Sequence, residues 1–418
     1  MSFQQGLSGL NAASKQLEVI GNNVANANTV GFKQARAEFA DVYANSLSGG
    51  GGTSIGIGTK LSTVAQQFTQ GNVSSTSNSL DIAINGGGFF RMSNNGVITY
   101  SRNGQFQMDK LGNIVDAEGK ILTGYPADAS GVLQKGSAVA LNINTADLQP
   151  LTTTGLTGTV NLDSRKAAID GTVIPFDINT PESYNDSTAI TTFDSLGNPH
   201  TIQSFFVKEL AAAPGSTVWS VYTAADGVLT TNAQPSATLT FDGTGINPVA
   251  GPAVAPVLNS ISFPVTTGAT DPLSMTIDYS SSTQFGASFS INSLTQDGYT
   301  SGRLAGFNTG ADGTIIGRYS NGQSKILGQV VLANFVNPNG LQSLGGNAWA
   351  ESGTSGAPLV GAPSTGSLGV LQSSAVEDSN TDLTAELVNM ITAQRYYQAN
   401  AQTIKTQDQV LQTLVNLR

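Results

Sequence analysis

The two ends of this chain carry helical apolar patterns, and this feature most constrains the fold, because everything else is inserted between them. In residues 1–36, apolar side chains recur at three-, four- and seven-residue steps: Phe3, Leu7, Leu10, Leu17, Ile20 and Val24. At the other end one seven-residue register runs through Leu383, Met390, Tyr397, Ile404 and Leu411, with Leu387, Ala401, Leu414 and Val415 beside it. These patterns predict two helices that pack along each other, as in a coiled coil.

The segment that follows the first helix predicts a turn and then a connection. Asn and Gly residues between Asn26 and Gly31 favour a break in the helix. We expect a second helical piece over 32–43, a flexible joint at Gly49 to Gly52, and one or two strands over 55–69. The Gly-rich joint lacks the Lys-Ser/Thr pair of a phosphate-binding loop, so the sequence does not favour nucleotide binding.

Composition limits the classes of protein that fit these 418 residues. Cysteine is absent, which excludes disulfides, thiolate metal sites and cysteine nucleophiles. The 48 glycines and the low charged fraction of 11% are typical of many short strands joined by tight turns. No apolar run approaches the roughly 18 residues of a membrane-spanning helix, and the first basic residue is Lys15, so we expect neither membrane insertion nor a cleaved secretory signal.

The net charge of −10 is concentrated in the middle of the chain. Residues 1–147 hold nine basic and nine acidic residues, residues 148–297 hold three and twelve, and residues 298–418 hold six and seven. A near-neutral frame with an acidic insert suggests that the frame packs against copies of itself while the insert faces solvent. A chance skew in an ordinary solvated domain is the alternative. The chain shows no basic patch with interleaved aromatic residues, so nucleic acid is not an expected partner.

Between the ends, turn signals predict a β-rich fold with nested domains. Asn-Gly and related turns separate short apolar runs from Leu80 to Tyr125, and the same style returns after Gly298. We therefore predict a mainly β chain with helical termini and these parts: a terminal helical domain (1–24 and 380–418), a connecting segment (25–71), a discontinuous β domain (72–147 and 298–372), an inserted acidic β domain (148–297) and a linker (373–379).

Residues that could carry catalysis are few. The single histidine, His200, follows Asp194 and Ser195, which permits a Ser-His-Asp hypothesis, but adjacency in sequence is not the geometry that a triad needs. The intervening Gly197-Asn198-Pro199 favours a plain hairpin turn. One histidine excludes a His-rich metal site, no acidic run has EF-hand spacing, and no pattern supports a glycosidase. We expect no enzyme activity, no metal and no cofactor.

The C-terminal helix has an unusual polar face. Its positions outside the apolar register are mostly neutral amides, where a solvated coiled coil normally carries Glu and Lys. Such a face suits packing against copies of the chain or the lining of a water-filled passage; an ordinary Gln-rich surface helix is the alternative. At about 1.5 Å per residue these 36 residues reach about 54 Å, longer than the first helix can cover.

Three long stretches resemble the bacterial flagellar axial proteins, the family of rod and hook proteins. The first is Gly21 to Lys33, with motif residues Asn26, Asn28, Thr29, Gly31, Phe32 and Lys33. The second is Leu80 to Phe90 and the third is Leu387 to Asn400. Residues 192–200 and 298–329 are similar to segments of the hook members rather than the rod members.

The resemblance implies that many copies polymerise into a curved, flexible tube that joins rod to filament, transmits torque and encloses the export channel. The terminal helices would form the inner tube, with interface residues Phe3, Leu7, Leu10, Leu17, Val24, Leu383, Leu387, Met390, Tyr397, Ile404, Leu411 and Leu414. The β domain would form a middle layer and the insert the outer surface. Implied partners are the chain itself, the rod, the hook cap, the hook–filament junction and length-control proteins, and the type III export apparatus. The implied location is extracellular, in the hook.

Two other functions remain open from the sequence. A distal-rod protein shares both terminal motifs, although the length of the acidic insert argues against it. A secreted β-rich adhesin or hydrolase would account for the composition but not for the paired terminal heptads. Residues 39–71 differ in length and glycine content between hook and rod members, so their structure bears on the distinction.

Overall fold

The computed structural model describes residues 2–42, 56–210, 215–231, 234–246 and 258–416. They divide into two compact units: unit 1 comprises residues 1–145, 306–318 and 324–418, and unit 2 comprises residues 146–305 and 319–323. Unit 1 carries 14 basic and 15 acidic residues, and unit 2 carries 4 and 13, so nearly all of the net charge lies in unit 2. The predicted fold class, mainly β with helical ends, is confirmed.

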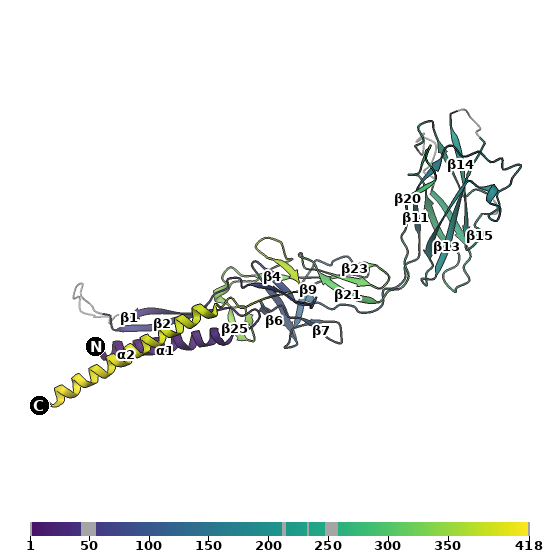
Figure 1. Ribbon diagram of the computed structural model, residues 1–418. Helices are drawn as coiled ribbons and strands as arrows, with labels where there is room; N and C mark the ends of the chain where they lie inside the picture. The colour runs from purple at the N-terminus through teal and green to yellow at the C-terminus, as the bar shows by residue number, and fades with distance from the viewer. Residues whose placement is uncertain (1, 43–55, 211–214, 232–233, 247–257, 417–418) are drawn as a thin grey trace. The chain divides into compact units, whose positions relative to one another are not determined.

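Two long helices begin and end unit 1 (Figure 1). Helix α1 is Ser2–Ala25 and helix α2 is Leu383–Asn416. The Asp382 carboxylate caps α2, because its Oδ1 accepts the backbone N–H groups of Thr384 at 2.9 Å and Ala385 at 3.1 Å. Helix α1 ends at the predicted place, where Asn26 begins the turn of the motif.

The helical piece that we predicted over 32–43 is wrong. Residues Ala35–Val42 form strand β1, which pairs antiparallel with β2 (Gly58–Gln66). The side chains of β1 alternate between more and less exposed positions, which is a period of two. In a segment of only eight residues this period is a weak signal, and the Ala and Glu residues of the segment also favour helix. The Gly49 to Gly52 joint lies outside the described residues.

The β domain of unit 1 is one large sheet with two small ribbons. The main path of the sheet runs β21-β22-β23-β9-β5-β6-β26-β25, and the ribbons pair β28 with β4 and β29 with β3. The strands are β3 (Val73–Ser75), β4 (Ile82–Asn85), β5 (Phe89–Asn94), β6 (Val97–Ser101), β7 (Gln107–Met108), β8 (Ile114–Val115), β9 (Ile121–Pro126), β10 (Val139–Ala140), β21 (Leu304–Thr309), β22 (Thr314–Tyr319), β23 (Ser324–Val330), β24 (Leu332–Asn334), β25 (Gln342–Gly345), β26 (Ala348–Ala350), β27 (Leu359–Gly361), β28 (Val370–Ser373) and β29 (Ala375–Glu377), with a 3-10 turn at Pro338–Gly340.

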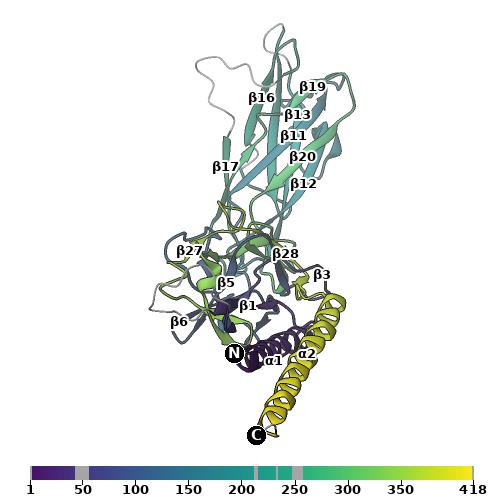
Figure 2. The same cartoon turned by 90° about the vertical axis from the view of Figure 1, so that its left-hand side faces the viewer.

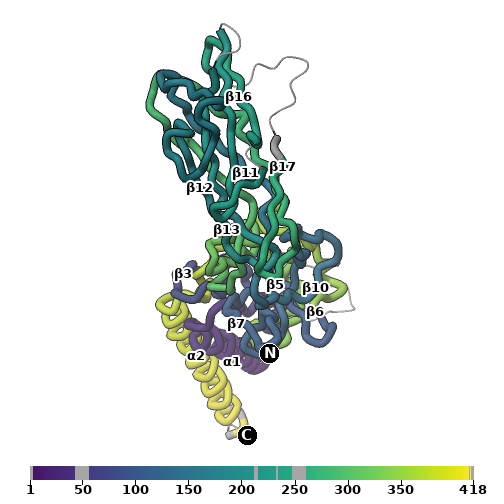
Figure 3. Tube along the Cα trace, turned by 90° about the vertical axis from the view of Figure 1, so that its right-hand side faces the viewer, coloured from purple at the N-terminus to yellow at the C-terminus, as the bar shows by residue number. Residues whose placement is uncertain are grey.

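Early and late parts of the sequence interleave in this domain, as the blue and the green-to-yellow segments of Figure 3 show. Strand β5 pairs with β24, and β6 pairs with β26. An aromatic core fills the space between them, in which Phe89, Tyr100, Phe335 and Trp349 meet edge to face. Neither segment could bury these rings alone, so the two halves form one core.

Unit 2 is a β-sandwich. One sheet holds β17 (Leu258–Phe263), β18 (Leu273–Asp278), β11 (Gly155–Asp163), β19 (Thr283–Phe285) and β20 (Ser290–Gln296). The other holds β12 (Asp186–Phe193), β13 (Pro199–Lys208), β14 (Thr217–Ala225), β15 (Val228–Leu229) and β16 (Ala237–Phe241); a 3-10 turn lies at Pro181–Ser183. The core between the sheets includes Phe206, Trp219 and Phe241, each fully buried.

A recurrent Asp-x-x-Gly-x turn closes hairpins in both units. Asp109, Asp128 and Asp194 each accept the backbone N–H groups of the residues two and four positions later. The glycine in the fourth position has positive φ, for example +82° at Gly197. The hairpin turn predicted at residues 197–199 is thus present.

We expect that in Tyr279→Phe the free energy of unfolding of unit 2 falls less steeply as the pH rises into the alkaline range. The Tyr279 hydroxyl is buried and donates to Ser204 Oγ at 2.9 Å, and burial raises the pKa of Tyr279 to about 12. Because a phenol in the unfolded chain ionises near pH 10, this stabilisation is complete below about pH 10 and is lost as the pH rises toward 12, by about 1.4 kcal/mol per pH unit. Urea unfolding of both proteins across this range measures the difference; parallel slopes would contradict it.

Candidate functional site

Helices α1 and α2 pack side by side in opposite directions, and the C-terminal end of α2 extends beyond α1 (Figures 1 and 2). Two glycines of α1 lie in this contact. A Cβ atom at Gly9 would lie 2.7 Å from Asn400 Oδ1, and one at Gly6 would lie 3.1 Å from Ile404 Cγ1. The small residues of α1 therefore let the two backbones come close.

The face of α2 that meets α1 contains only part of the predicted heptad, since Ile404 lies against Gly6. Leu383, Tyr397 and Leu411 are 47%, 39% and 54% exposed in the single chain, so these three residues are not buried against α1. A parallel register of small and polar residues faces inward instead, namely Glu386, Ala393 and Asn400. Gly6 makes room for the Ile404 side chain, and Gly9 makes room for that of Asn400.

The other predicted interface residues divide between the two faces. Phe3, Leu7 and Leu387 are each about 45% exposed, and Leu10, Leu17, Val24, Met390 and Ile404 are partly buried. The side chain of Leu414 lies outside the described part of the chain. Further large apolar side chains project outward from α2 where no prediction was made, namely Val388, Ile391, Tyr396 and Val410.

A buried charge cluster lies where the helical ends meet the β domain. We call it the hub: Lys33, Arg102 and Glu377. The Glu377 carboxylate accepts hydrogen bonds from Lys33 Nζ at 2.6 Å and from Arg102 Nη1 at 3.0 Å. None of the three side chains is more than 4% exposed. The hub joins residues 344 positions apart in the sequence.

Each member of the hub has a further hydrogen-bond partner. Glu377 Oε1 also accepts the backbone N–H of Gly71 at 2.9 Å, and Lys33 Nζ donates to the carbonyl of Thr69 at 2.8 Å. Arg102 Nη2 donates to the carbonyl of Gly86 at 2.9 Å. Burial lowers the pKa of Lys33, and the attraction of Glu377 offsets this only in part.

The motif residues fold into the turn that delivers Lys33. Thr29 Oγ1 donates to Asn26 Oδ1 at 3.2 Å, and the backbone N–H of Phe32 donates to the Thr29 carbonyl at 3.2 Å. The backbone N–H of Gly31 donates to the Glu377 carbonyl at 2.8 Å. Asn28 is exposed. The motif thus has a structural role in docking the end of α1.

A second layer of polar contacts lies between the hub and the helices. Asn380 Oδ1 accepts the backbone N–H of Gln34 at 2.7 Å, and the Gln34 side chain donates to Glu386 at 2.5 Å. Asn23 exchanges two hydrogen bonds with the backbone of Ala35. These residues, like Arg102 and Glu377, were not predicted from the sequence; residues 373–379, expected as a linker, contain β29 and the hub carboxylate.

His200 does not form a triad with Ser195. Its Nδ1 lies 2.7 Å from Asp226 Oδ2 and its Nε2 lies 3.4 Å from Asp194 Oδ2, whereas Ser195 Oγ accepts the backbone N–H of Thr270. Burial alone would raise the pKa of Asp194, but hydrogen bonds from Thr267 and Asn198 hold it well below its usual value. The arrangement fastens a turn.

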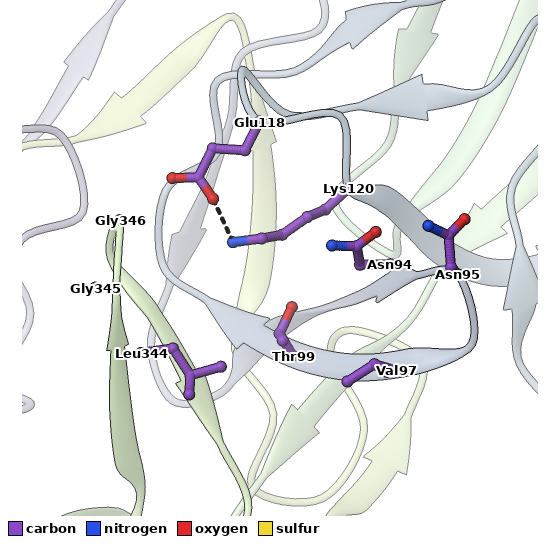
Figure 4. Close-up of a pocket in the computed structure, with 9 residues that line it drawn as sticks. All are labelled: Asn94, Asn95, Val97, Thr99, Glu118, Lys120, Leu344, Gly345 and Gly346. Atoms are coloured by element: carbon purple, nitrogen blue, oxygen red, sulfur yellow. Dashed lines mark ion pairs between the residues drawn. The ribbon is translucent and has the colours of Figure 1, made fainter.

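A pocket of about 590 Å³ lies in unit 1 among the turns that follow β5, β8 and β25 (Figure 4). Its ionisable lining residues, Glu118 and Lys120, pair with each other at 2.6 Å. The pocket therefore offers no free base or nucleophile. The described residues hold no cluster of His, Cys, Asp and Glu that could bind a metal, and neither described helix is apolar enough over its length to span a membrane.

Comparisons with known protein families place flagellar models along most of the chain. Residues 3–33 match the flagella basal body rod protein family, and residues 83–188 match the flagellar hook protein FlgE/F/G D1 domain. Residues 161–299 match the flagellar basal body protein FlaE D2 domain, and residues 372–417 match the flagellar basal body rod FlgEFG protein C-terminal family.

Individual relatives match the chain from end to end. It is 43% identical to the flagellar hook protein FlgE of Escherichia coli, and the match covers 100% of each chain. It is 31% identical to the FlgE of Borreliella burgdorferi, over 100% of this chain and 99% of the relative. The crystal structure of Helicobacter pylori flagellar hook protein FlgE2 has a similar fold, with a TM-score of 0.55, 14% identity and coverage of 73% of this chain and 99% of that one.

We expect Gly31→Ala to disrupt docking of the motif far more than Gly119→Ala. Both glycines have positive φ, +71° and +82°, so an alanine at either costs about 1–2 kcal/mol of backbone strain. Only at Gly31 would the new Cβ meet backbone, 2.5 Å from the Asn103 nitrogen, while nothing lies within 4 Å at Gly119. Denaturant unfolding of unit 1 should show an additional loss of about 1–3 kcal/mol for Gly31→Ala. Equal losses would contradict the close approach.

Proposed function

This chain belongs to the flagellar hook protein FlgE family, and we propose that its copies assemble through the terminal helices into the inner wall of the hook. It is a structural subunit of the bacterial flagellar hook, not an enzyme. As such it polymerises with itself into the curved, flexible tube that transmits torque from rod to filament. The distal-rod and adhesin alternatives are set aside, because full-length relatives are named hook proteins.

The large apolar side chains that α2 leaves exposed are the observation that supports the interface. They are Leu383, Leu387, Val388, Ile391, Tyr396, Tyr397, Val410 and Leu411, each 39–58% exposed in the single chain. Large apolar side chains exposed in such number along one helix exceed the scattered ones of an ordinary surface, and such surface marks a contact with a partner. Few charged residues interrupt this helix, so copies of α2 could approach one another without strong repulsion.

The distribution of charge supports a layered arrangement of the parts. The terminal helical domain (1–24 and 380–418) would lie innermost, the β domain (72–147 and 298–372) in a middle layer and the insert (148–297) outermost. Like-charged domains repel when packed closely, and the insert lies almost entirely in unit 2, which carries most of the net charge. The near-neutral unit 1 is better suited to dense contact with copies of itself.

Further partners follow from the proposed place in the flagellum. They are the rod below, the hook cap during growth, and the junction and length-control proteins. Export would proceed through the flagellar type III apparatus without a cleaved signal peptide, and neither nucleic acid nor membrane insertion is part of the proposal. An export assay in a strain that lacks this apparatus tests the route: full-length chain found outside those cells would contradict it.

The assignment to the hook can be tested in a strain from which the gene is deleted. Electron microscopy of its flagellar bases should show a complete rod without hook or filament. A truncated rod would instead indicate a rod component, and intact flagella would contradict both functions.

The interface is tested in the same strain by the double variant Leu387→Ser, Ile391→Ser. We expect cells that make the variant to lack hooks, because two large exposed side chains that copies would bury have been removed, while the denaturant midpoint of purified monomer stays unchanged. Gln394→Ser is the control, since it brings a comparable loss of helix propensity on the same helix without loss of apolar area. Normal hooks with the double variant would contradict the proposed interface.

A further inference from the structure

We propose that Glu377 is the positioning residue of the terminal helices: its carboxylate fixes the direction in which α1 and α2 leave the β domain and so carries force between them. The inference rests on the proposed function, in which torque must pass between the inner helices and the outer domains. Nothing in the matched family descriptions assigns a role to this residue.

The first step of the argument is where the hub lies along the chain. Lys33 is separated from the end of α1 at Ala25 by one short turn, and Glu377 from the start of α2 at Leu383 by five residues. Both covalent connections between the helices and the β domain therefore pass through the hub. A contact that fixes Lys33 to Glu377 fixes both connections together.

The second step is that the hub also fastens the connections to the β domain itself. Arg102, at the end of β6, donates to Glu377, and its guanidinium carbon lies 5.4 Å from the centre of the Phe89 ring in the aromatic core. The Gly71 N–H donates to Glu377, and the Thr69 carbonyl accepts from Lys33, so the connection that follows β2 is also bound at the hub. One carboxylate thus holds the N-terminal motif, this connection and the core to the C-terminal strand β29.

The other hydrogen bonds between the helical ends and the β domain in the described residues include neutral ones and one from Ser74 Oγ to the Asp378 carboxylate at 3.0 Å. Asn347 Nδ2 donates to the Val30 carbonyl at 2.9 Å, and Trp349 Nε1 donates to Gln66 Oε1 at 2.6 Å. Charge-assisted hydrogen bonds are stronger and more directional than neutral ones. The two ion pairs of the hub are also shielded from water, which strengthens them. The hub is therefore the stiffest of these contacts.

The third step concerns charge balance. The hub contains two cations and one carboxylate, all buried, so Glu377 is the group that keeps Lys33 and Arg102 from facing each other as uncompensated like charges. A glutamine has the same shape and could still accept from Lys33 and Gly71. The role we assign to Glu377 therefore depends on its charge and not on its volume.

A double-mutant cycle tests this dependence on charge. We expect Glu377→Gln to abolish hooks or reduce them to a small fraction of the wild-type number in the deletion strain. Lys33→Met alone should have a mild effect, because it leaves the Glu377–Arg102 pair. Adding Lys33→Met to Glu377→Gln should restore part of the hook number, because one of the two unpaired cations is removed. A double variant worse than both single variants would overturn the proposal.

A distance measurement tests positioning directly. The chain lacks cysteine, so spin labels can be placed at Val97→Cys in the β domain and Thr392→Cys on α2, both exposed, in subunits diluted into hooks of unlabelled wild-type chain. We expect a narrow distance distribution in the wild type and a broad one with Glu377→Gln, while Glu351→Gln, which removes an exposed carboxylate of the same unit, stays narrow. An unchanged narrow distribution for Glu377→Gln would overturn the proposal.

These outcomes separate the positioning role from the function of the chain. If wild-type chain forms hooks and Glu377→Gln leaves both hook number and distance distribution unchanged, only the positioning role fails. If deletion of the gene leaves hooks intact, the proposed function itself fails.

Discussion

The buried carboxylate of Glu377 is the interaction on which the arrangement of unit 1 depends. Charges taken out of water are costly unless opposite charges and hydrogen bonds replace the lost hydration, and removal of one partner of a buried ion pair typically costs about 3–5 kcal/mol. Glu377 accepts bonds from an N-terminal lysine, a backbone amide and an arginine of the β domain. Segments from both ends of the sequence must therefore arrive together before the hub is electrically balanced.

A second constraint is side-chain size, which determines how closely α1 and α2 pack beyond the hub. Glycines on α1 and small or polar residues on α2 let the backbones approach within one chain, which leaves the large apolar side chains of α2 directed outward. A subunit built in this way keeps its strongest apolar surface for its neighbours. This division suits a polymer in which each chain is held together by close backbone packing and the wall is held together by larger side chains.

The sequence predicted the periodic parts of this structure and missed those that depend on distant partners. Helices α1 and α2, the break at Asn26 and the turn before His200 were predictable because their signals are local. The strand Ala35–Val42 was mistaken for helix, since only its pairing with β2, which begins at Gly58, fixes its period. The seven-residue register of α2 was visible, but the sequence did not show that Asn400, from a second register, would join Ile404 in the contact with Gly6 and Gly9.

The hub could not be predicted for the same reason. Lys33 was identified as part of a motif, but Arg102 and Glu377 are single charges in unremarkable turns and strands, hundreds of residues apart. No local signal singled out Glu377, because it follows two apolar residues and stands beside another acid, Asp378. The charge distribution, in contrast, was readable in advance, since net charge needs no knowledge of contacts.

Electron cryomicroscopy of hooks assembled from the wild-type chain would test the central claim most directly, because it shows the hub and the helix interface in the same reconstruction. The account predicts that in every subunit the Glu377 carboxylate lies between Lys33 and Arg102, and that Ile391 and Leu411 are buried against helices of neighbouring copies. A hub that is open in the assembled tube, or an α2 whose large apolar side chains remain exposed to solvent, would contradict it.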